Sequence, residues 1–313
     1  MKKVIFIIPY FGKFNNYFQL FLNSCKCNED YNWLIFTDDK SDYNFPKNVK
    51  KIEMNLKELQ ELIERKLSFS VNLTKAYKLC DFKPLYGYIF EEYIKDFSFW
   101  GYCDNDLIFG NIKHFLDLDK LYDYDKIGVL GHFTLFKNTP EIRNLFLLDN
   151  RYLEVVSSEK SMKFDEEYGE DFGTSINNIF EKNGKKILAL DSFADIYVKS
   201  SHFKLTHYLG EGKGYLIEKK DKSFFVWDNG NLYKIICKNG NIIKKEYMYI
   251  HLQKRKMKMK ISGFHKSYKI IPNEFAEFSD ENLLKEKRYS INLHYFRIRF
   301  KNLKNKIKDR GNK

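Results

Sequence analysis

The sequence predicts a mixed α/β protein, with helices on both faces of its sheet, an antiparallel β-meander late in the chain and a basic helical tail. Three observations support this prediction. Two apolar runs near the start flank a helical pattern, Asn-Gly turns separate three later apolar runs, and cations concentrate at the C-terminal end. With 313 residues, 43% of them hydrophobic and 17% aromatic, the chain is long enough to bury a full core.

The first 37 residues predict a strand, a helix and a second strand. Val4–Ile8 and Trp33–Thr37 are short, continuous apolar runs, and between them apolar residues recur at helical spacing from Tyr17 to Leu22. This order is typical of the start of a parallel sheet, in which ligands usually bind at the carboxyl ends of the strands. We therefore expect the loops at Tyr10-Phe11 and Asp38-Asp39 to lie at such an end.

The middle and late parts of the chain continue the α/β pattern and then change to β. Hydrophobic spacing predicts helices at about 56–63, 72–96, 140–147 and 174–181, and strands at 97–103, 126–130 and 186–190, with 131–137 continuing or forming a hairpin. After residue 214, strands are predicted at 224–227, 232–237 and 242–250. Asn-Gly turns join these three strands, so they predict an antiparallel meander.

Most of the net charge of +12 lies at the C-terminal end, since residues 282–313 carry eleven Lys/Arg and two Asp/Glu, a net charge of +9. We therefore expect residues 1–281 to form one globular domain and residues 282–313 to form a basic amphipathic tail. Apolar residues alternate with the cations of the tail, which suits a helix that lies on an anionic membrane surface. A solvated, partly disordered tail is the alternative.

The short apolar runs also bear on where the protein works. Val4–Ile8 is too short for a transmembrane helix, and although Met1-Lys2-Lys3 before it imitates a signal peptide, no small-residue cleavage site follows. The five cysteines include neither a CxxC pair nor a cluster with zinc spacing. We expect a cytoplasmic protein in a reducing compartment, held by its tail at the inner face of the plasma membrane.

Asp104-Asn105-Asp106 is the motif that indicates chemistry most directly. It follows an aromatic run, Trp100-Gly101-Tyr102-Cys103, and Gly110 comes four residues later. Two carboxylates at the end of a buried strand are costly unless a cation compensates them, and such a pair can share one divalent ion bound to phosphates. Mg²⁺ or Mn²⁺ suits these hard oxygen ligands. An ordinary polar turn is the alternative interpretation.

Together with other segments, this motif resembles the GT-A-fold, Asp-x-Asp glycosyltransferases of bacterial capsular polysaccharide, lipopolysaccharide and other surface glycan synthesis. The resemblance covers about residues 3–255 and depends on the order of its parts, which are Ile-Pro-Tyr-Phe-Gly at 8–12, Phe-Thr-Asp-Asp at 36–39, Cys-Asp-Phe-Lys-Pro at 80–84, Asp-Asn-Asp at 104–106 and His251. It implies a Rossmann-like GT-A fold. It also implies metal-dependent transfer of a sugar from a nucleotide-sugar, a UDP-sugar, to a lipid-linked glycan acceptor.

The resemblance further implies roles for individual residues. Asp104, Asp106 and His251 would hold Mn²⁺ or Mg²⁺, Asp104 would also reach the donor, and Lys254 would neutralise its diphosphate. The other expected donor-binding residues are Tyr10, Phe11, Asp38 and Asp39 for a uracil-type base and its ribose, and Asp81 and Lys83 for the donor sugar. The alternatives are core packing for the two aromatic residues, a plain turn at 38–39, a surface ion pair at 81–83 and a structural histidine at 251. Lys83 also departs from the family pattern, which has an arginine at a different spacing.

An acidic loop at residues 165–171 offers a general base, Glu170 or Asp171, if the reaction inverts the anomeric carbon. A retaining enzyme needs no such base, and a solvated acidic loop is the alternative.

Two other functional classes fit the sequence less well. A basic nucleic-acid-binding protein without enzymatic activity would explain Lys254-Arg255-Lys256 and the tail, but the body of the chain is neutral and no reader motif is present, so no nucleic-acid partner is expected. A phosphotransferase could use the same carboxylates, but the chain has no Walker-type loop.

Overall fold

The computed structural model describes residues 2–166, 175–210, 213–219, 223–238, 240–262, 265–279, 283, 286, 288 and 293–311. The strands in these ranges form three sheets, which we call A, B and C. Sheet A contains, in spatial order, β3 (Val49–Glu53), β2 (Tyr31–Thr37), β1 (Lys2–Pro9), β4 (Phe97–Cys103), β7 (Phe133–Lys137), β6 (Lys126–Ile127) and β8 (Ile187–Leu188). Sheet B contains β11 (Tyr215–Ile217), β10 (Leu205–Tyr208), β9 (Ala194–Ile196), β15 (Tyr249–His251) and β5 (Leu107–Phe109). Sheet C contains β14 (Asn241–Tyr247), β13 (Asn231–Lys238), β12 (Ser223–Asp228), β17 (Ser267–Ile271), β18 (Glu274–Ala276) and β16 (Lys258–Met259).

Sheet A has a parallel half and is covered on both faces. Its strands β3, β2, β1 and β4 are parallel, whereas β7 runs antiparallel to β4. Because successive side chains of a strand point to opposite faces, Val4, Phe6 and Ile8 pack into one hydrophobic core, and Ile5 and Ile7 pack into another. A continuous apolar run therefore forms a strand that is buried on both sides.

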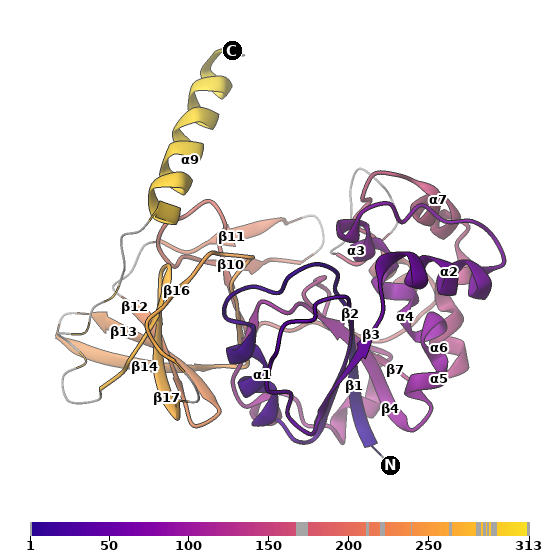
Figure 1. Ribbon diagram of the computed structural model, residues 1–313, viewed down its shortest axis with the longest axis horizontal. Coiled ribbons are helices and arrows are strands. Elements are labelled where there is room, and N and C mark those ends of the chain that lie inside the picture. Colours follow the sequence, from indigo (N-terminus) through magenta and orange to yellow (C-terminus); the bar gives the residue numbers. More distant parts are fainter. Residues whose placement is uncertain are drawn as a thin grey trace.

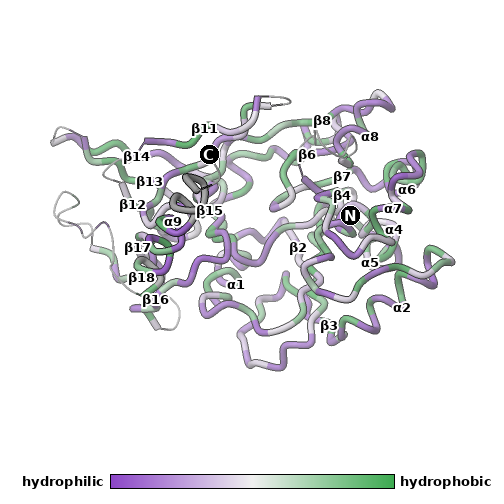
Figure 2. Tube along the Cα trace, turned by 90° about the horizontal axis from the view of Figure 1, so that it is seen from above, coloured by the Kyte–Doolittle hydropathy of each residue, from purple (hydrophilic) through white to green (hydrophobic). Residues whose placement is uncertain are grey.

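Helices supply the layers that cover these two faces. Helix α1 (Phe18–Lys26) packs on the face of Val4, and the other α-helices described in the body pack on the opposite face. These are α2 (Leu56–Leu67), α3 (Leu79–Phe82), α4 (Tyr86–Ile89), α5 (Glu91–Ile94), α6 (Pro140–Asn144), α7 (Arg151–Ser157) and α8 (Ile176–Lys182). Figures 1 and 2 place α2 and α4–α7 at one end of the molecule and sheet C at the other. Helix α2 starts with a capping box between Asn55 and Glu58, which satisfies backbone amides at its first turn.

Sheets B and C share a third core. Ile108 of β5 and Ile250 of β15 contribute to it from sheet B, and Phe225 and Trp227 of β12 contribute from sheet C. The indole nitrogen of Trp227 donates a hydrogen bond of 2.8 Å to the carbonyl of Phe109. Sheet C is therefore fixed against the strand that follows Asp104–Asp106.

The predicted mixed α/β fold, with helices on both faces of a sheet and a late antiparallel meander, is confirmed. Three details of the prediction were wrong. The helical region at 72–96 is divided into short helices and turns, and the strand expected at 126–130 ends at Ile127 because Gly128 adopts a positive φ of 87°. The run at 242–250 is two strands, because the chain leaves sheet C after Tyr247 and enters sheet B at Tyr249.

Helix α9 (Leu293–Gly311) extends from the body in Figure 1. It carries an exposed apolar stripe at helical spacing, formed by Leu293, Phe296, Phe300 and Leu303. The side chain of Asn302 donates a hydrogen bond to the carbonyl of Lys199 in the body. No helix in the described ranges is both long and apolar enough to span a bilayer.

Candidate active site

The candidate site lies where the chain passes from sheet A to sheet B. Strand β4 ends at Cys103, and Asp104–Asp106 connect it to β5. The amide of Asp104 donates to the carbonyl of His132 over 3.0 Å, and the amide of Leu252 donates to the carbonyl of Asp106 over 3.1 Å. Backbone hydrogen bonds from two distant segments therefore hold the short connection.

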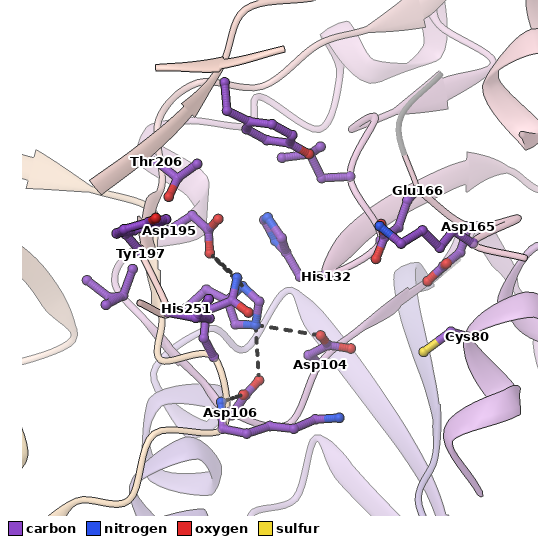
Figure 3. A pocket seen from close by; sticks show the side chains of 18 of the residues that line it. Cys80, Asp104, Asp106, His132, Asp165, Glu166, Asp195, Tyr197, Thr206 and His251 are labelled. Atoms are coloured by element: carbon purple, nitrogen blue, oxygen red, sulfur yellow. Dashed lines mark hydrogen bonds and ion pairs between the residues drawn. The ribbon is translucent and has the colours of Figure 1, made fainter. Parts of the chain in front are cut away.

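Strand pairing in sheet B brings His251 to these carboxylates. In the antiparallel pair of β15 and β5, His251 lies opposite Leu107, directly after Asp106. Its Nε2 is 3.4 Å from Oδ1 of Asp106 and 3.6 Å from Oδ2 of Asp104 (Figure 3). The structure thus brings together the three residues predicted to hold a metal.

These three residues fit a divalent cation. One ligand atom from each of Asp104, Asp106 and His251 lies within 4.8 Å of the others. Oδ1 of Asp106 is buried and accepts no hydrogen bond from the described residues, whereas its Oδ2 accepts one from the amide of Lys254. Two carboxylates and an imidazole are a donor set suited to Mn²⁺ or Mg²⁺, with the imidazole favouring Mn²⁺.

The backbone after His251 is turned sharply toward this cluster. Gln253 and Lys254 both have a φ of 54°, in the left-handed region that non-glycine residues rarely adopt. This conformation directs the amide of Lys254 at Asp106. Two consecutive residues in a sparsely populated conformation, next to a cluster of charges, are typical of a functional site.

Lys83 neutralises carboxylates on the other side of the cluster. Its Nζ donates to Oδ1 of Asp104 over 2.9 Å and to the carbonyl of Gly131 over 2.8 Å, and it lies 3.1 Å from Oδ2 of Asp165. Burial alone would raise the pKa of Asp104, but Lys83 and His251 hold it at about 2. Burial raises the pKa of Asp165 to about 7, against the opposing effect of Lys83. Asp104 is therefore ionised under all ordinary conditions, and Asp165 titrates near neutrality.

The two histidines of the site have opposite charge preferences. Burial opposes the charge of His251, yet Asp106 and Asp195 raise its pKa well above the ordinary value. Burial and the nearby charge of His251 lower the pKa of His132 to about 4. The two rings are 4.6 Å apart between centroids, and Tyr249 Oη is 3.1 Å from Nδ1 of His132. At neutral pH, His132 is thus uncharged, and His251 carries the proton that a cation would replace.

Two cavities meet at the cluster. The histidine cavity has a volume of about 530 Å³, and its polar lining includes His132, Asp165, Glu166 and Asp195. The tyrosine cavity has a volume of about 300 Å³ and is lined by aromatic and apolar residues that include Tyr10, Phe11, Tyr86 and Tyr102. Both are lined by Tyr77, Cys80, Lys83, Asp104, Asp106 and Lys254.

The predicted donor-binding residues are distributed unevenly around these cavities. Tyr10, Phe11, Lys83 and Lys254 line the tyrosine cavity. Asp38 and Asp39 are not among the residues described as lining either cavity; they accept hydrogen bonds from the amides of Gly12 and Phe14 over 2.7 and 2.9 Å. These two carboxylates fix the loop that carries Tyr10 and Phe11.

Asp81 requires a correction, because the structure buries it away from both cavities. It is 0% exposed, and its carboxylate is 2.7 Å from Nζ of Lys78. It also accepts hydrogen bonds from the amides of Met162 and Phe164, at 2.9 and 3.0 Å. Three N–H groups inside the fold engage both carboxylate oxygens, so Asp81 has a structural role. Glu170 and Asp171 lie outside the described residues.

Sequence reasoning gave no individual role to four acidic or imidazole residues of the histidine cavity, namely His132, Asp165, Glu166 and Asp195, although His132 lies in the segment at 131–137 that was predicted to continue or pair with a strand. Asp195 was detectable as a single carboxylate in the apolar segment Phe193–Ile196. Asp165 lies in the acidic loop that was recognised, but the residues singled out there were its neighbours. His132 directly follows Gly131, whose carbonyl accepts a hydrogen bond from Lys83, and this contact between distant segments is what places it at the site.

The fold and the site define an α/β protein with a buried carboxylate–imidazole cluster between two cavities. The chain belongs to a family of unknown function, DUF6625, which matches residues 6–279. No curated protein matches the sequence. Among solved structures, the galactosyltransferase LgtC in complex with donor and acceptor sugar analogues is similar, with 12% identity and a TM-score of 0.31, covering 62% of this chain and 75% of that one. An active-site mutant of LgtC gives 13% identity and a TM-score of 0.33, covering 62% and 74%.

Proposed function

We propose that this protein is a metal-dependent glycosyltransferase that moves a sugar from a nucleotide-sugar, a UDP-sugar, to a hydroxyl of a lipid-linked surface glycan. One observation carries the proposal: the cluster of Asp104, Asp106 and His251 lies at the junction of two cavities of different polarity. A nucleotide-sugar has this same division, with a flat base at one end, a sugar at the other and a diphosphate between them.

The tyrosine cavity suits the nucleoside. Its aromatic lining offers flat apolar surface, and the backbone of Tyr10 and Phe11 is fixed from behind by Asp38 and Asp39. The histidine cavity suits the sugars, because its carboxylates and imidazoles can hydrogen-bond hydroxyl groups. This assignment places the diphosphate beside Asp104 and Asp106.

The leaving group carries the charge that the site must stabilise. In the transfer, the acceptor oxygen bonds to the anomeric carbon, the bond from that carbon to the diphosphate breaks, and its electron pair stays on the diphosphate. Mn²⁺ or Mg²⁺ held by Asp104, Asp106 and His251 would supply positive charge there. Lys254 lines both cavities, so its side chain can add a second positive charge to the diphosphate.

The acceptor hydroxyl must lose its proton as it attacks. For an inverting reaction, Glu170 or Asp171 is the expected base, and the described neighbour Glu166 lines the histidine cavity. In a retaining reaction the departing diphosphate oxygen can take the proton, so no protein base is needed at this position. Either route requires the acceptor to enter through the histidine cavity.

The membrane role of the tail is part of the same proposal. Helix α9 presents Phe296 and Phe300, which are 59% and 71% exposed, together with Arg297 and Lys301. Apolar and cationic side chains on one exposed helix suit an anionic lipid surface. Docking there would hold the protein at the cytoplasmic face of the membrane, beside a lipid-linked acceptor.

The test is calorimetric titration of UDP and of GDP, each with and without Mn²⁺, into the unaltered chain and two variants. Asp106→Asn removes one carboxylate of the cluster, and Asp119→Asn removes a carboxylate that is 82% exposed elsewhere. We expect UDP-selective, Mn²⁺-dependent binding that is lost in Asp106→Asn and kept in Asp119→Asn. Metal-independent binding, or equal binding by both variants, would contradict the proposal. Salt-sensitive RNA binding that survives Asp106→Asn would favour a nucleic-acid-binding protein.

A further inference from the structure

Asp195 lies against the side of His251 that faces away from the proposed metal ligands. It belongs to β9, which pairs in parallel with β15, so that Asp195 and His251 are register partners. Its Oδ1 is 2.9 Å from Nδ1 of His251 (Figure 3), and the residue is 7% exposed. This contact is the shortest that the imidazole makes with any of the three nearby carboxylates.

Gln253 holds the same oxygen of Asp195. Its Nε2 donates to Oδ1 over 2.6 Å and lies 3.2 Å from Nδ1 of His251. A carboxylate oxygen can only accept, so the 2.9 Å contact between Oδ1 of Asp195 and Nδ1 of His251 is a hydrogen bond when Nδ1 carries a proton. Two N–H groups, one from Gln253 and one from His251, then converge on that oxygen.

A proton on Nδ1 determines what the other ring nitrogen can do. The two nitrogens of an imidazole point in diverging directions, and a neutral ring with Nδ1–H has its free electron pair on Nε2. Nε2 is the atom that faces Asp104 and Asp106. Metal-binding histidines usually donate their second N–H to a carboxylate in this way, which fixes the tautomer and the ring orientation.

The other cluster at this place is less consistent with these contacts. His132, Asp195 and His251 also have potential ligand atoms within 4.8 Å of one another. A cation bound there through Nδ1 of His251 and Oδ1 of Asp195 would replace the proton on Nδ1 and compete with Gln253 for that oxygen.

We propose that Asp195 is a positioning residue, which accepts the Nδ1 proton of His251 and so directs Nε2 at the metal held by Asp104 and Asp106. The inference rests on the proposed metal-dependent function and deepens it. Asp195 itself does not touch the metal or the donor in this role. Its contribution is the orientation of one ligand.

The experiment measures Mn²⁺ binding to the purified full chain by the loss of the free Mn²⁺ signal in electron paramagnetic resonance. Asp195→Ala removes the acceptor and should weaken Mn²⁺ binding by about 10- to 100-fold. Asp195→Asn keeps an acceptor oxygen for both N–H groups and should stay within a few-fold of the unaltered chain. Asp191→Asn changes an exposed carboxylate four residues earlier in the chain and should have no effect.

A second readout separates orientation from general damage. With Co²⁺ in place of Mn²⁺, the visible absorption bands of Asp195→Ala should match those of His251→Ala, because both lose the imidazole from the metal. If Asp195→Ala binds Mn²⁺ like the unaltered chain, or if Asp195→Asn loses as much affinity as Asp195→Ala, the positioning role is overturned while the proposed function stands. If the unaltered chain binds no Mn²⁺ at all, both proposals are overturned.

Discussion

Replacing Asp81 with Asn should destabilise the protein without weakening ligand binding. Asp81 and Lys78 form an ion pair in which both side chains are nearly inaccessible, at 0% and 3% exposed. Nζ of Lys78 also donates to the carbonyls of Val155 and Lys160, at 2.6 and 2.7 Å. The amide oxygen of Asn can still accept from the backbone, but it cannot compensate the charge of Lys78.

The expected loss follows from this burial. Breaking one side of a buried ion pair costs about 3–5 kcal/mol, because the remaining charge is left uncompensated. For a chain of this size, such a loss should lower the Tm by roughly 5–8 °C. The double variant Lys78→Met with Asp81→Asn removes that charge, and should recover part of the loss.

Thermal unfolding followed by circular dichroism measures the effect, and titration of UDP with Mn²⁺ at a temperature where the variant is folded measures binding. The matched control is Asp119→Asn, whose exposed ion pair with Lys3 should contribute little to the free energy of unfolding. A Tm within about 2 °C of the unaltered chain, or a loss of UDP affinity at full folding, would refute the structural role assigned to Asp81.

Three further predictions concern other parts of the chain. Burial lowers the pKa of Lys126 from 10.5 to about 7, so between these values the unfolded state holds more protons and the free energy of unfolding rises with pH, by at most about 1.4 kcal/mol per unit. Lys126→Met should remove this rise. Urea titrations at about pH 7 and pH 9 measure it, and the same change in the free energy of unfolding between the two pH values in both chains would contradict the prediction. At Gly87, a Cβ would lie 2.3 Å from the ring of Trp100. Gly87→Ala should therefore lower the free energy of unfolding by about 1–3 kcal/mol and alter the near-ultraviolet circular dichroism spectrum. An unchanged spectrum and Tm would show that the ring moves freely. Phe296→Asp combined with Phe300→Asp should abolish sedimentation with phosphatidylglycerol vesicles, whereas Ile243→Asp, at a residue 50% exposed on β14, should not; equal loss in both would argue against docking through α9.

The sequence was most informative where a feature is local. Apolar runs predicted β1, β2 and β4, because a strand that is buried on both faces needs no partner to be recognised. Asn-Gly turns predicted β12, β13 and β14, because the turn of a hairpin has its own local sequence signal. The carboxylates of Asp104 and Asp106 were recognisable because they directly follow a buried aromatic strand.

The remaining features depend on contacts between distant segments. Asp195 reaches the site only because the short strand β9 pairs with β15, and a strand of three residues has almost no pattern of its own. The role of Asp81 was wrong because its partners include amides some 80 residues later in the chain, and no local spacing reveals them. The break after Tyr247 depends in the same way on which sheet receives the next strand.

The passage of the chain between two sheets within Asp104–Asp106 has a consequence for cooperativity. Two potential ligands come from the connection itself and the third comes from β15, so a bound cation would add a cross-link between sheets A and B, which already share the core that contains Val4, Leu107 and Tyr249. Local opening of sheet B would then require the ligand to dissociate first. Amide hydrogen exchange in β5, β9 and β15 should therefore slow together when the site is occupied, by a factor set by the ligand concentration relative to its Kd.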